Sequence, residues 1–226
     1  INSLNLNITL ALCAGGFLDQ SVNAFNAFYT AKSISDFEAM LLIVEDKNFY
    51  NHRGISLKSI TRAFIRNTKA LGIEEGGSTI TQQLAKSLFF SPEQTIRRKI
   101  KEAIAALLIE IHYTKEEILL AYINDVFVAQ AGRRAIHGFG LASQFFFGTD
   151  LKNLTLDQKA LLVGMLKGPS LYSPTKNPER AKARRDLVLT LVKNDSLISE
   201  EEYFELKDRP LKIIPPTFKS LSKYPA

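Results

Sequence analysis

The distribution of proline constrains the fold of this chain more than any other feature. Between residues 37 and 168 the only proline is Pro92, whereas seven others follow, from Pro169 to Pro225. Because proline interrupts helices and central strands, a long stretch with one proline is compatible with long helices. The sequence shows no series of alternating polar and apolar residues typical of strands. We therefore expect a mainly α-helical body followed by a loop-rich tail.

The same pattern divides the chain into three parts. Residues 1–35 are rich in asparagine and weakly patterned, residues 36–210 carry the helical patterns, and residues 211–226 resemble a linker. Hydrophobic residues make up 46% of the chain, so the middle part can bury a sizeable core. We expect a poorly defined N-terminal segment, one large folded domain and a linker-like tail.

The charge balance indicates an anionic partner. The formal net charge is +6, which is compatible with nucleic acid, a membrane surface or a phosphorylated substrate, and the charge alone does not choose between them. The single cysteine, Cys13, excludes an intrachain disulfide. His52, His112 and His137 lack the spacing of metal ligands, so no protein metal site is predicted.

The beginning of the chain gives no membrane-spanning segment. The apolar stretch from Ile8 to Leu18 is shorter than the roughly 20 residues that a span needs. It also lacks the basic flank of a signal peptide. Because the chain begins with Ile1 rather than Met, we expect a fragment whose targeting or anchoring segment is missing.

Two adjacent acids, Glu45 and Asp46, directly follow the aliphatic run "AMLLIV". One interpretation is a solvated acid pair at the end of a helix. The other is a carboxylate partly removed from water by the run before it, because desolvation raises a carboxyl pKa and makes the group a better general base. These residues alone leave both interpretations open.

The stretch "GGSTITQQLAKSLFF" predicts a helix that begins after Thr79. Thr79 and Gln82 fit the capping pattern Thr-x-x-Gln, and Gln82 and Lys86 are predicted on the polar face. The predicted buried face consists of Ile80, Leu84 and Leu88. The free N–H groups of such a first turn, at the positive end of the helix dipole, can bind an anion. An ordinary capped helix is equally compatible with the pattern.

The stretch "TIRRKIKEAIAALLIEIHY" predicts a second amphipathic helix. Its predicted core stripe consists of Ile100, Ile104, Leu107, Leu108 and Ile111. On the other side, Arg98 and Lys99 lie within one turn of Glu102. This group is either a salt-bridged surface or a diphosphate site beside a working carboxylate. A further helix is predicted to begin after Thr114.

Taken together, these runs resemble family 51 glycosyltransferases, the peptidoglycan transglycosylase domain of class A penicillin-binding proteins and of monofunctional transglycosylases. The resemblance covers roughly residues 36–210, is most like the 1b kind, and rests above all on "EDKNFYNHRGIS" and "GGSTITQQLAK". The matching runs, in the order of the family, are residues 45–56, 75–89, 97–110, 115–148 and 154–178.

The resemblance implies roles for individual residues. Glu45 corresponds to the catalytic base of the family, and Glu102 to its second essential glutamate. We also expect Asp46 to shape or polarise the substrate site. Residues implied to bind the donor phosphates and sugars are Ser78, Thr79, Gln82, Gln83, Lys86, Arg98, Lys99, Lys167 and Ser170.

The resemblance implies a mainly α, lysozyme-like, two-lobed fold and an enzyme that polymerises lipid II into glycan strands. Undecaprenyl diphosphate would leave with inversion at the sugar. The implied partners are lipid II, the growing glycan chain and a membrane surface, but no nucleic acid. A transpeptidase domain is expected to follow in the parent chain. The implied location is the outer face of the bacterial plasma membrane. No cofactor is required, and Mg²⁺ or Mn²⁺ bound with the substrate diphosphate remains an alternative.

Two departures and two rival functions accompany this interpretation. Ser87 stands where the family usually has Asn or Asp, and Val128-Ala129 where it usually has Leu-Gly or Phe-Gly, which keeps a weakened activity open. Residues 56–77 are either a membrane-facing flap or an amphipathic core helix. The rivals are a lysozyme-like enzyme that cleaves peptidoglycan and a non-catalytic basic domain that binds membranes or nucleic acid.

Overall fold

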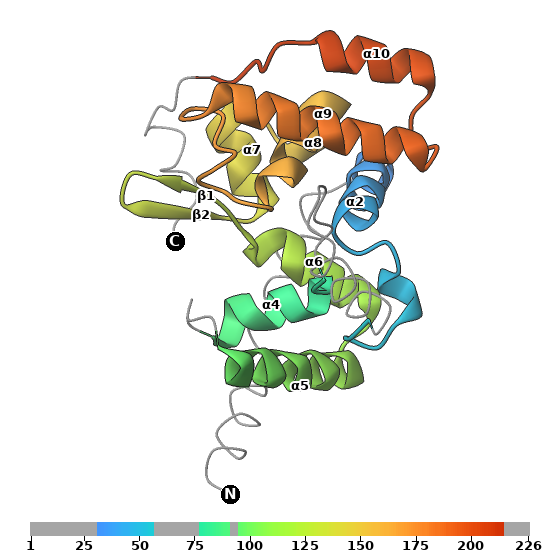
Figure 1. Ribbon diagram of the computed structural model, residues 1–226, viewed down its shortest axis with the longest axis vertical. Coiled ribbons are helices and arrows are strands. Elements are labelled where there is room, and N and C mark those ends of the chain that lie inside the picture. Colours follow the sequence, from blue (N-terminus) through green and yellow to red (C-terminus); the bar gives the residue numbers. More distant parts are fainter. Residues whose placement is uncertain (1–30, 57–76, 91–94, 215–226) are drawn as a thin grey trace, which may run out of the picture. The chain divides into compact units, whose positions relative to one another are not determined.

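Figure 1 shows a computed structural model of the chain, which describes residues 31–56, 77–90 and 95–214, with side chains from residue 36 onward. The helices are α2 (Ala31–Glu45), α4 (Ile80–Phe89), α5 (Ile96–His112), α6 (Lys115–Asp125), α7 (Phe139–Phe147), α8 (Leu156–Met165), α9 (Pro178–Asn194) and α10 (Glu200–Asp208). Two short 3-10 helices are η1 (Phe49–Asn51) and η2 (Leu151–Asn153), and two strands are β1 (Phe127–Ala131) and β2 (Arg134–His137). The expected mainly α-helical fold is confirmed.

The chain forms two compact units. Helix α2 belongs to the second unit, except for its last residue, Glu45, which belongs to the first. The described part of the first unit consists of residues 45–56, 77–90 and 95–126 and contains α4, α5 and α6. In it α4 packs against both α5 and α6. The core residues from these three helices include Ile80, Leu84, Ala106, Ile109, Ile118 and Tyr122.

The second unit contains the remainder of α2 and everything described after Val126. Its central helix is α8, which is buried along most of its length and packs mainly against α9. Phe37 of α2 meets Phe139 of α7 edge to face, with ring centroids 4.8 Å apart. The antiparallel strands β1 and β2 pair with an irregularity between Phe127 and Ala129. The run from Ala160 to Met165 in α8 is apolar apart from Gly164 and buried, so this part of the helix is enclosed by its neighbours.

The predicted helix starts are confirmed by their caps. The Thr79 hydroxyl accepts from the backbone N–H of Gln82, and the Gln82 side chain accepts in return from the N–H of Thr79. Thr114 and Glu117 form the same reciprocal pair at the start of α6. Gln82 was predicted on the polar face beside Lys86, and that placement is wrong, because its side chain folds back into the cap and is buried.

The core stripe predicted for α5 is wrong. Ile100, Ile104 and Ile111 are 57%, 53% and 73% exposed, and Leu107 is exposed as well. The buried residues of α5 are instead Glu102, Ala106 and Ile109 on the opposite face. Periodicity shows that one face of a helix is apolar, but only the neighbours decide which face is covered. Small residues such as Ala106 allow a backbone to approach closely, and this is the face that meets the rest of the unit.

Several sequence predictions fall largely outside the described residues. They concern the flap or helix at residues 56–77 and most of the two terminal segments. The first described helix begins at Ala31, five residues before the start predicted for the folded domain. Among the residues that the structure describes, no helix is long and apolar enough to cross a membrane.

Candidate active site

Glu45 ends helix α2, and its carboxylate is held by a side chain of helix α4. The side-chain amide of Gln83 donates from Nε2 to Glu45 Oε2 at 2.9 Å. The Tyr122 hydroxyl, from α6, donates to Oε1 of the same amide at 2.9 Å. Glu45 is partly buried, so its carboxylate is neither enclosed in the core nor fully solvated. A positioned carboxylate of this kind is suited to accept a proton.

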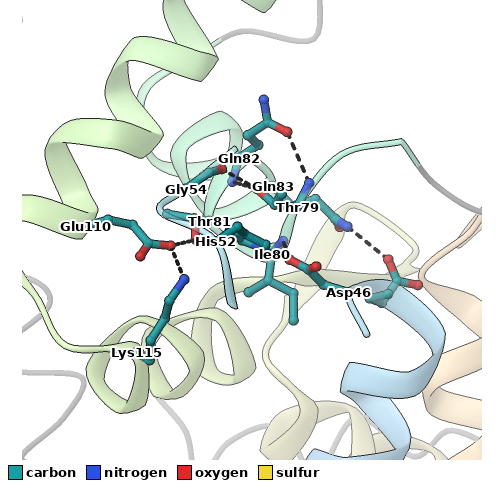
Figure 2. A network of polar contacts seen from close by, with 11 residues as sticks. Asp46, His52, Gly54, Thr79, Ile80, Thr81, Gln82, Gln83, Glu110 and Lys115 are labelled. Atoms are coloured by element: carbon teal, nitrogen blue, oxygen red, sulfur yellow. Dashed lines mark hydrogen bonds and ion pairs between the residues drawn. The ribbon is translucent and has the colours of Figure 1, made fainter. Parts of the chain in front are cut away.

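Asp46 connects the end of α2 to the beginning of α4. Its Oδ2 atom accepts from the backbone N–H of Ile80 at 3.0 Å and lies 2.9 Å from His52 Nε2. The carboxylate is buried at the N-terminus of α4, where the positive end of the helix dipole favours a negative charge. The two adjacent acids therefore differ in their contacts: Asp46 accepts from the first turn of α4, and Glu45 accepts from the Gln83 side chain. Figure 2 shows Asp46, Ile80 and His52 in this network. Substrate contact by Asp46 stays a prediction.

The loop after Asp46 is fixed between α4 and α5 by a close approach at Gly54. The Thr79 hydroxyl donates to the Gly54 carbonyl oxygen at 2.6 Å. Gly54 has a φ of +77°, and a Cβ atom there would lie 2.7 Å from the carbonyl oxygen of Ala106. Only glycine fits both the backbone angle and the space. The glycine of the "EDKNFYNHRG" run is thus needed for packing against α5.

A second polar network joins helices α4, α5 and α6. Glu110 of α5 accepts from the Thr81 hydroxyl of α4 and from Lys115 Nζ of α6, both at 2.6 Å through Oε1. The Lys115 ammonium group also lies 4.4 Å from the ring centroid of Phe49. Because the Glu110 side chain is nearly fully buried, its charge is stabilised by these partners. The network fixes α4 relative to its neighbours, and α4 carries Gln83.

Arg98, Lys99, Glu102 and Ser78 form a group that we call the cation cluster. Glu102 is 1% exposed, with Arg98 Nη1 3.0 Å from its Oε1 and Lys99 Nζ 3.1 Å from its Oε2. Lys99 Nζ also donates to the Ser78 hydroxyl at 2.7 Å. The Lys99 side chain is half exposed, so part of its charge faces solvent. The cluster thus holds two cations on a buried carboxylate, with Lys99 also bonded to Ser78 just before α4.

The structure places most of the predicted site residues in the first unit. There Lys86 is exposed one turn after Gln82 on α4. Lys167 and Ser170 belong to the second unit, where both are exposed after the end of α8. The predicted site residues that the first unit contains are Glu45, Asp46, Ser78, Thr79, Gln82, Gln83, Lys86, Arg98, Lys99 and Glu102.

The two sequence departures have separate structural settings. Ser87 is exposed on α4 beside Lys86. Val128 and Ala129 are buried in strand β1 of the second unit, so they are packing residues of that core. In the part of the chain that the structure describes, no group of three or more His, Cys, Asp or Glu side chains could hold a metal ion.

Tyr122, which is hydrogen-bonded to Gln83 and through it connected to Glu45, was not predicted from the sequence as a site residue. It is 1% exposed. Burial, and then the nearby carboxylates of Glu45 and Asp46, raise the pKa of Tyr122 well above its ordinary range. A tyrosine among the apolar residues of "EEILLAYIND" gives little signal of its own, because a buried tyrosine is usually a core residue with one hydrogen bond. Only its contact with Gln83, 39 positions earlier, connects it to Glu45.

The transglycosylase family matches residues 21–193, so the chain belongs to that family. Among its relatives, penicillin-binding protein 1B of Vibrio cholerae serotype O1 is 50% identical over 173 residues, covering 76% of this chain and 22% of that protein. Penicillin-binding protein 1B of Escherichia coli K12 is 48% identical over 175 residues, covering 77% and 21%. The chain thus spans about a fifth of the length of these relatives.

Solved structures are similar to this chain too. The crystal structure of penicillin-binding protein 1A from Haemophilus influenzae aligns with a TM-score of 0.42 and 28% identity, over 62% of this chain and 17% of that chain. Family membership confirms the resemblance that the sequence motifs indicated.

Proposed function

We propose that this chain is a peptidoglycan glycosyltransferase that polymerises lipid II, with Glu45 as the general base. The observation that carries the proposal is the Glu45 carboxylate held by Gln83, in the same unit as the cation cluster. Glu45 removes the proton from the 4-hydroxyl of the acceptor GlcNAc. The oxygen then forms a bond to C1 of the donor MurNAc, while the bond from C1 to the diphosphate oxygen breaks. Attack from the opposite face inverts the configuration at C1.

The chain's cations would stabilise the leaving group. As undecaprenyl diphosphate departs, negative charge develops on its oxygen, and preorganised cations reduce the cost of that charge. Lys86 and the cation cluster of the first unit would do this. A role for Lys167, which belongs to the second unit, stays an expectation from the family resemblance. Glu102 would act by holding Arg98 and Lys99 in place. A divalent ion, Mg²⁺ or Mn²⁺, would arrive with the substrate diphosphate rather than in a site of its own.

The parent protein would place this domain at the outer face of the bacterial plasma membrane. The relatives are named penicillin-binding proteins and are several times longer than this chain, which supports a transpeptidase domain elsewhere in the parent chain. The substrate's lipid tail requires access to a membrane surface.

The exposed apolar face of α5 supports such a membrane contact. Ile96, Ile100, Ile104 and Ile111 lie exposed along it, and Arg97 and Lys101 beside them are exposed too. A helix with an apolar face and neighbouring cations binds an anionic lipid surface, because it gains both apolar burial and electrostatic attraction. We therefore assign this face to anionic lipid headgroups and the acyl boundary beneath them.

The double variant Ile100→Ser/Ile104→Ser should bind anionic vesicles about 10-fold more weakly than wild type, because two large apolar side chains no longer enter the lipid. Cosedimentation with vesicles that contain phosphatidylglycerol measures this. Phe204→Ser, at an exposed apolar residue of the second unit, is the matched control and should bind as wild type does. Unchanged binding of the double variant would contradict the assignment of α5 to the membrane.

A substrate test separates the proposed reaction from its rivals. The protein is incubated with labelled lipid II and, separately, with finished glycan strands. The proposal expects polymer from lipid II and no fragments from glycan. Fragments from glycan would indicate a lysozyme-like enzyme, which needs a protonated acid for a sugar leaving group. Binding without turnover of either substrate would indicate a non-catalytic basic domain.

A further inference from the structure

We propose that Tyr122 is a positioning residue for Glu45 and that it acts through Gln83. The inference rests on the proposed function, because it assigns Tyr122 a role for the general base of that reaction. Three helices meet in this arrangement: Glu45 ends α2, Gln83 lies on α4 and Tyr122 on α6. The three side chains form one chain of two hydrogen bonds, each 2.9 Å long.

The direction of these bonds follows from the chemistry of an amide. Gln83 has an oxygen that accepts and a nitrogen that donates. Because the Tyr122 hydroxyl donates to Oε1, the amide presents Nε2 to Glu45. A flipped amide would place Oε1 against the Glu45 carboxylate, where two oxygens repel each other. The hydroxyl of Tyr122 therefore selects the one amide orientation that binds an ionised Glu45.

Tyr122 is suited to this role because it stays a donor. Its side chain is buried in the first unit, and a tyrosine hydroxyl keeps its proton at neutral pH. Burial raises the pKa of Tyr122 further, in the same direction. The packing of α6 against α4 fixes the ring, so the hydroxyl has little freedom to turn away. It does not itself transfer a proton. It holds an amide, and the amide holds the base.

The role assigned to Gln83 changes accordingly. The resemblance implies that Gln83 binds substrate, but in this structure its amide joins Glu45 to Tyr122. Productive geometry for a general base requires positioning within a few tenths of an ångström, and side chains behind the first contact usually provide it. Gln83 and Tyr122 supply this support from two different helices.

The test is a double-mutant cycle on lipid II polymerisation. Tyr122→Phe removes only the hydroxyl, and kcat should fall about 10-fold with KM within twofold of wild type, because loss of one hydrogen bond misorients the base without touching substrate. In a Gln83→Leu background, Tyr122→Phe should cause no further loss, because the connection is already broken. Tyr203→Phe, which removes a hydroxyl paired with Thr190 in the second unit, is the matched control and should keep wild-type kcat.

Several outcomes would overturn the inference. They are a wild-type kcat for Tyr122→Phe, a rise in KM at unchanged kcat, and an equal loss from Tyr122→Phe in both backgrounds. If Tyr122→Phe alone does not fold, Gln83→Leu is compared with Gln83→Leu/Tyr122→Phe, whose facing side chains are both apolar. Equal activity of these two supports the inference, and a further loss in the double variant overturns it. Wild-type protein that makes no polymer would instead refute the proposed function, and this inference with it.

Discussion

Glu45→Gln should reduce the rate of lipid II polymerisation by about 10²–10⁴-fold, which corresponds to roughly 3–5 kcal/mol of barrier. The amide has nearly the same shape as the carboxylate but cannot accept the proton of the acceptor hydroxyl. KM should change little, because the proposed cation contacts to the diphosphate remain. The measurement is the initial rate of polymer formation from labelled lipid II, with a melting curve to show that the variant is folded.

Glu38→Gln is the informative comparison for this variant. Glu38 lies two turns earlier on the same helix, is partly buried, and burial raises its pKa. A carboxyl group with a perturbed pKa is a natural rival for the role of base. Among the residues that the structure describes, none donates to Glu38 a hydrogen bond like the one that Gln83 gives Glu45, and we expect Glu38→Gln to keep near-normal activity. Normal polymerisation by Glu45→Gln, or a large loss only in Glu38→Gln, would refute the assignment of Glu45.

Glu102→Gln should lower polymerisation roughly 10- to 100-fold, because residues that hold catalytic groups in place typically have effects of this size. Glu102 is buried between Arg98 and Lys99, and its charge keeps both cations on one side of α5. Without that charge they repel each other and lose their common anchor. The effect should fall on kcat/KM, because diphosphate contacts act both in binding and as the leaving group departs.

The control for Glu102 is the same substitution at an exposed site in the same unit. Glu116→Gln, in the first turn of α6, should leave the rate within about twofold of wild type. Melting curves of both variants separate unfolding from lost activity. Wild-type kcat/KM in a folded Glu102→Gln would show that the cation cluster is a salt-bridged surface, the alternative that the sequence left open.

The sequence predicted features that depend on local chemistry. Thr79 and Thr114 each precede a residue whose side chain can complete a cap three positions later, so both helix starts were correctly predicted. The salt bridges of Glu102 with Arg98 and Lys99 follow from the spacing of one helical turn. Family membership followed from the motifs and their order. The caps and the salt bridges involve residues a few positions apart, and the family is recognised from an ordered set of motifs. None of these signals depends on how the helices pack.

Features that depend on neighbours distant in sequence were not predicted. The apolar stripe of α5 was assigned to the core, but Ile100 and Ile104 face outward because small residues and Glu102 form the face that packs. Gln82 was assigned to the polar face, but the cap draws it inward. A periodic pattern fixes the separation of two faces and leaves open which one meets the rest of the protein.

The sequence by itself determined the family, the helical class, the helix caps and the pair of acids at Glu45 and Asp46. Only the tertiary structure decided which partner each acid has. Asp46 accepts from the backbone at the start of α4, whereas Glu45 accepts from Gln83, which in turn accepts from Tyr122. The physical reason is distance along the chain. These contacts join residues 34 to 39 positions apart, and only the packing of α4 against α6 and the loop at Gly54 brings such residues within hydrogen-bonding distance.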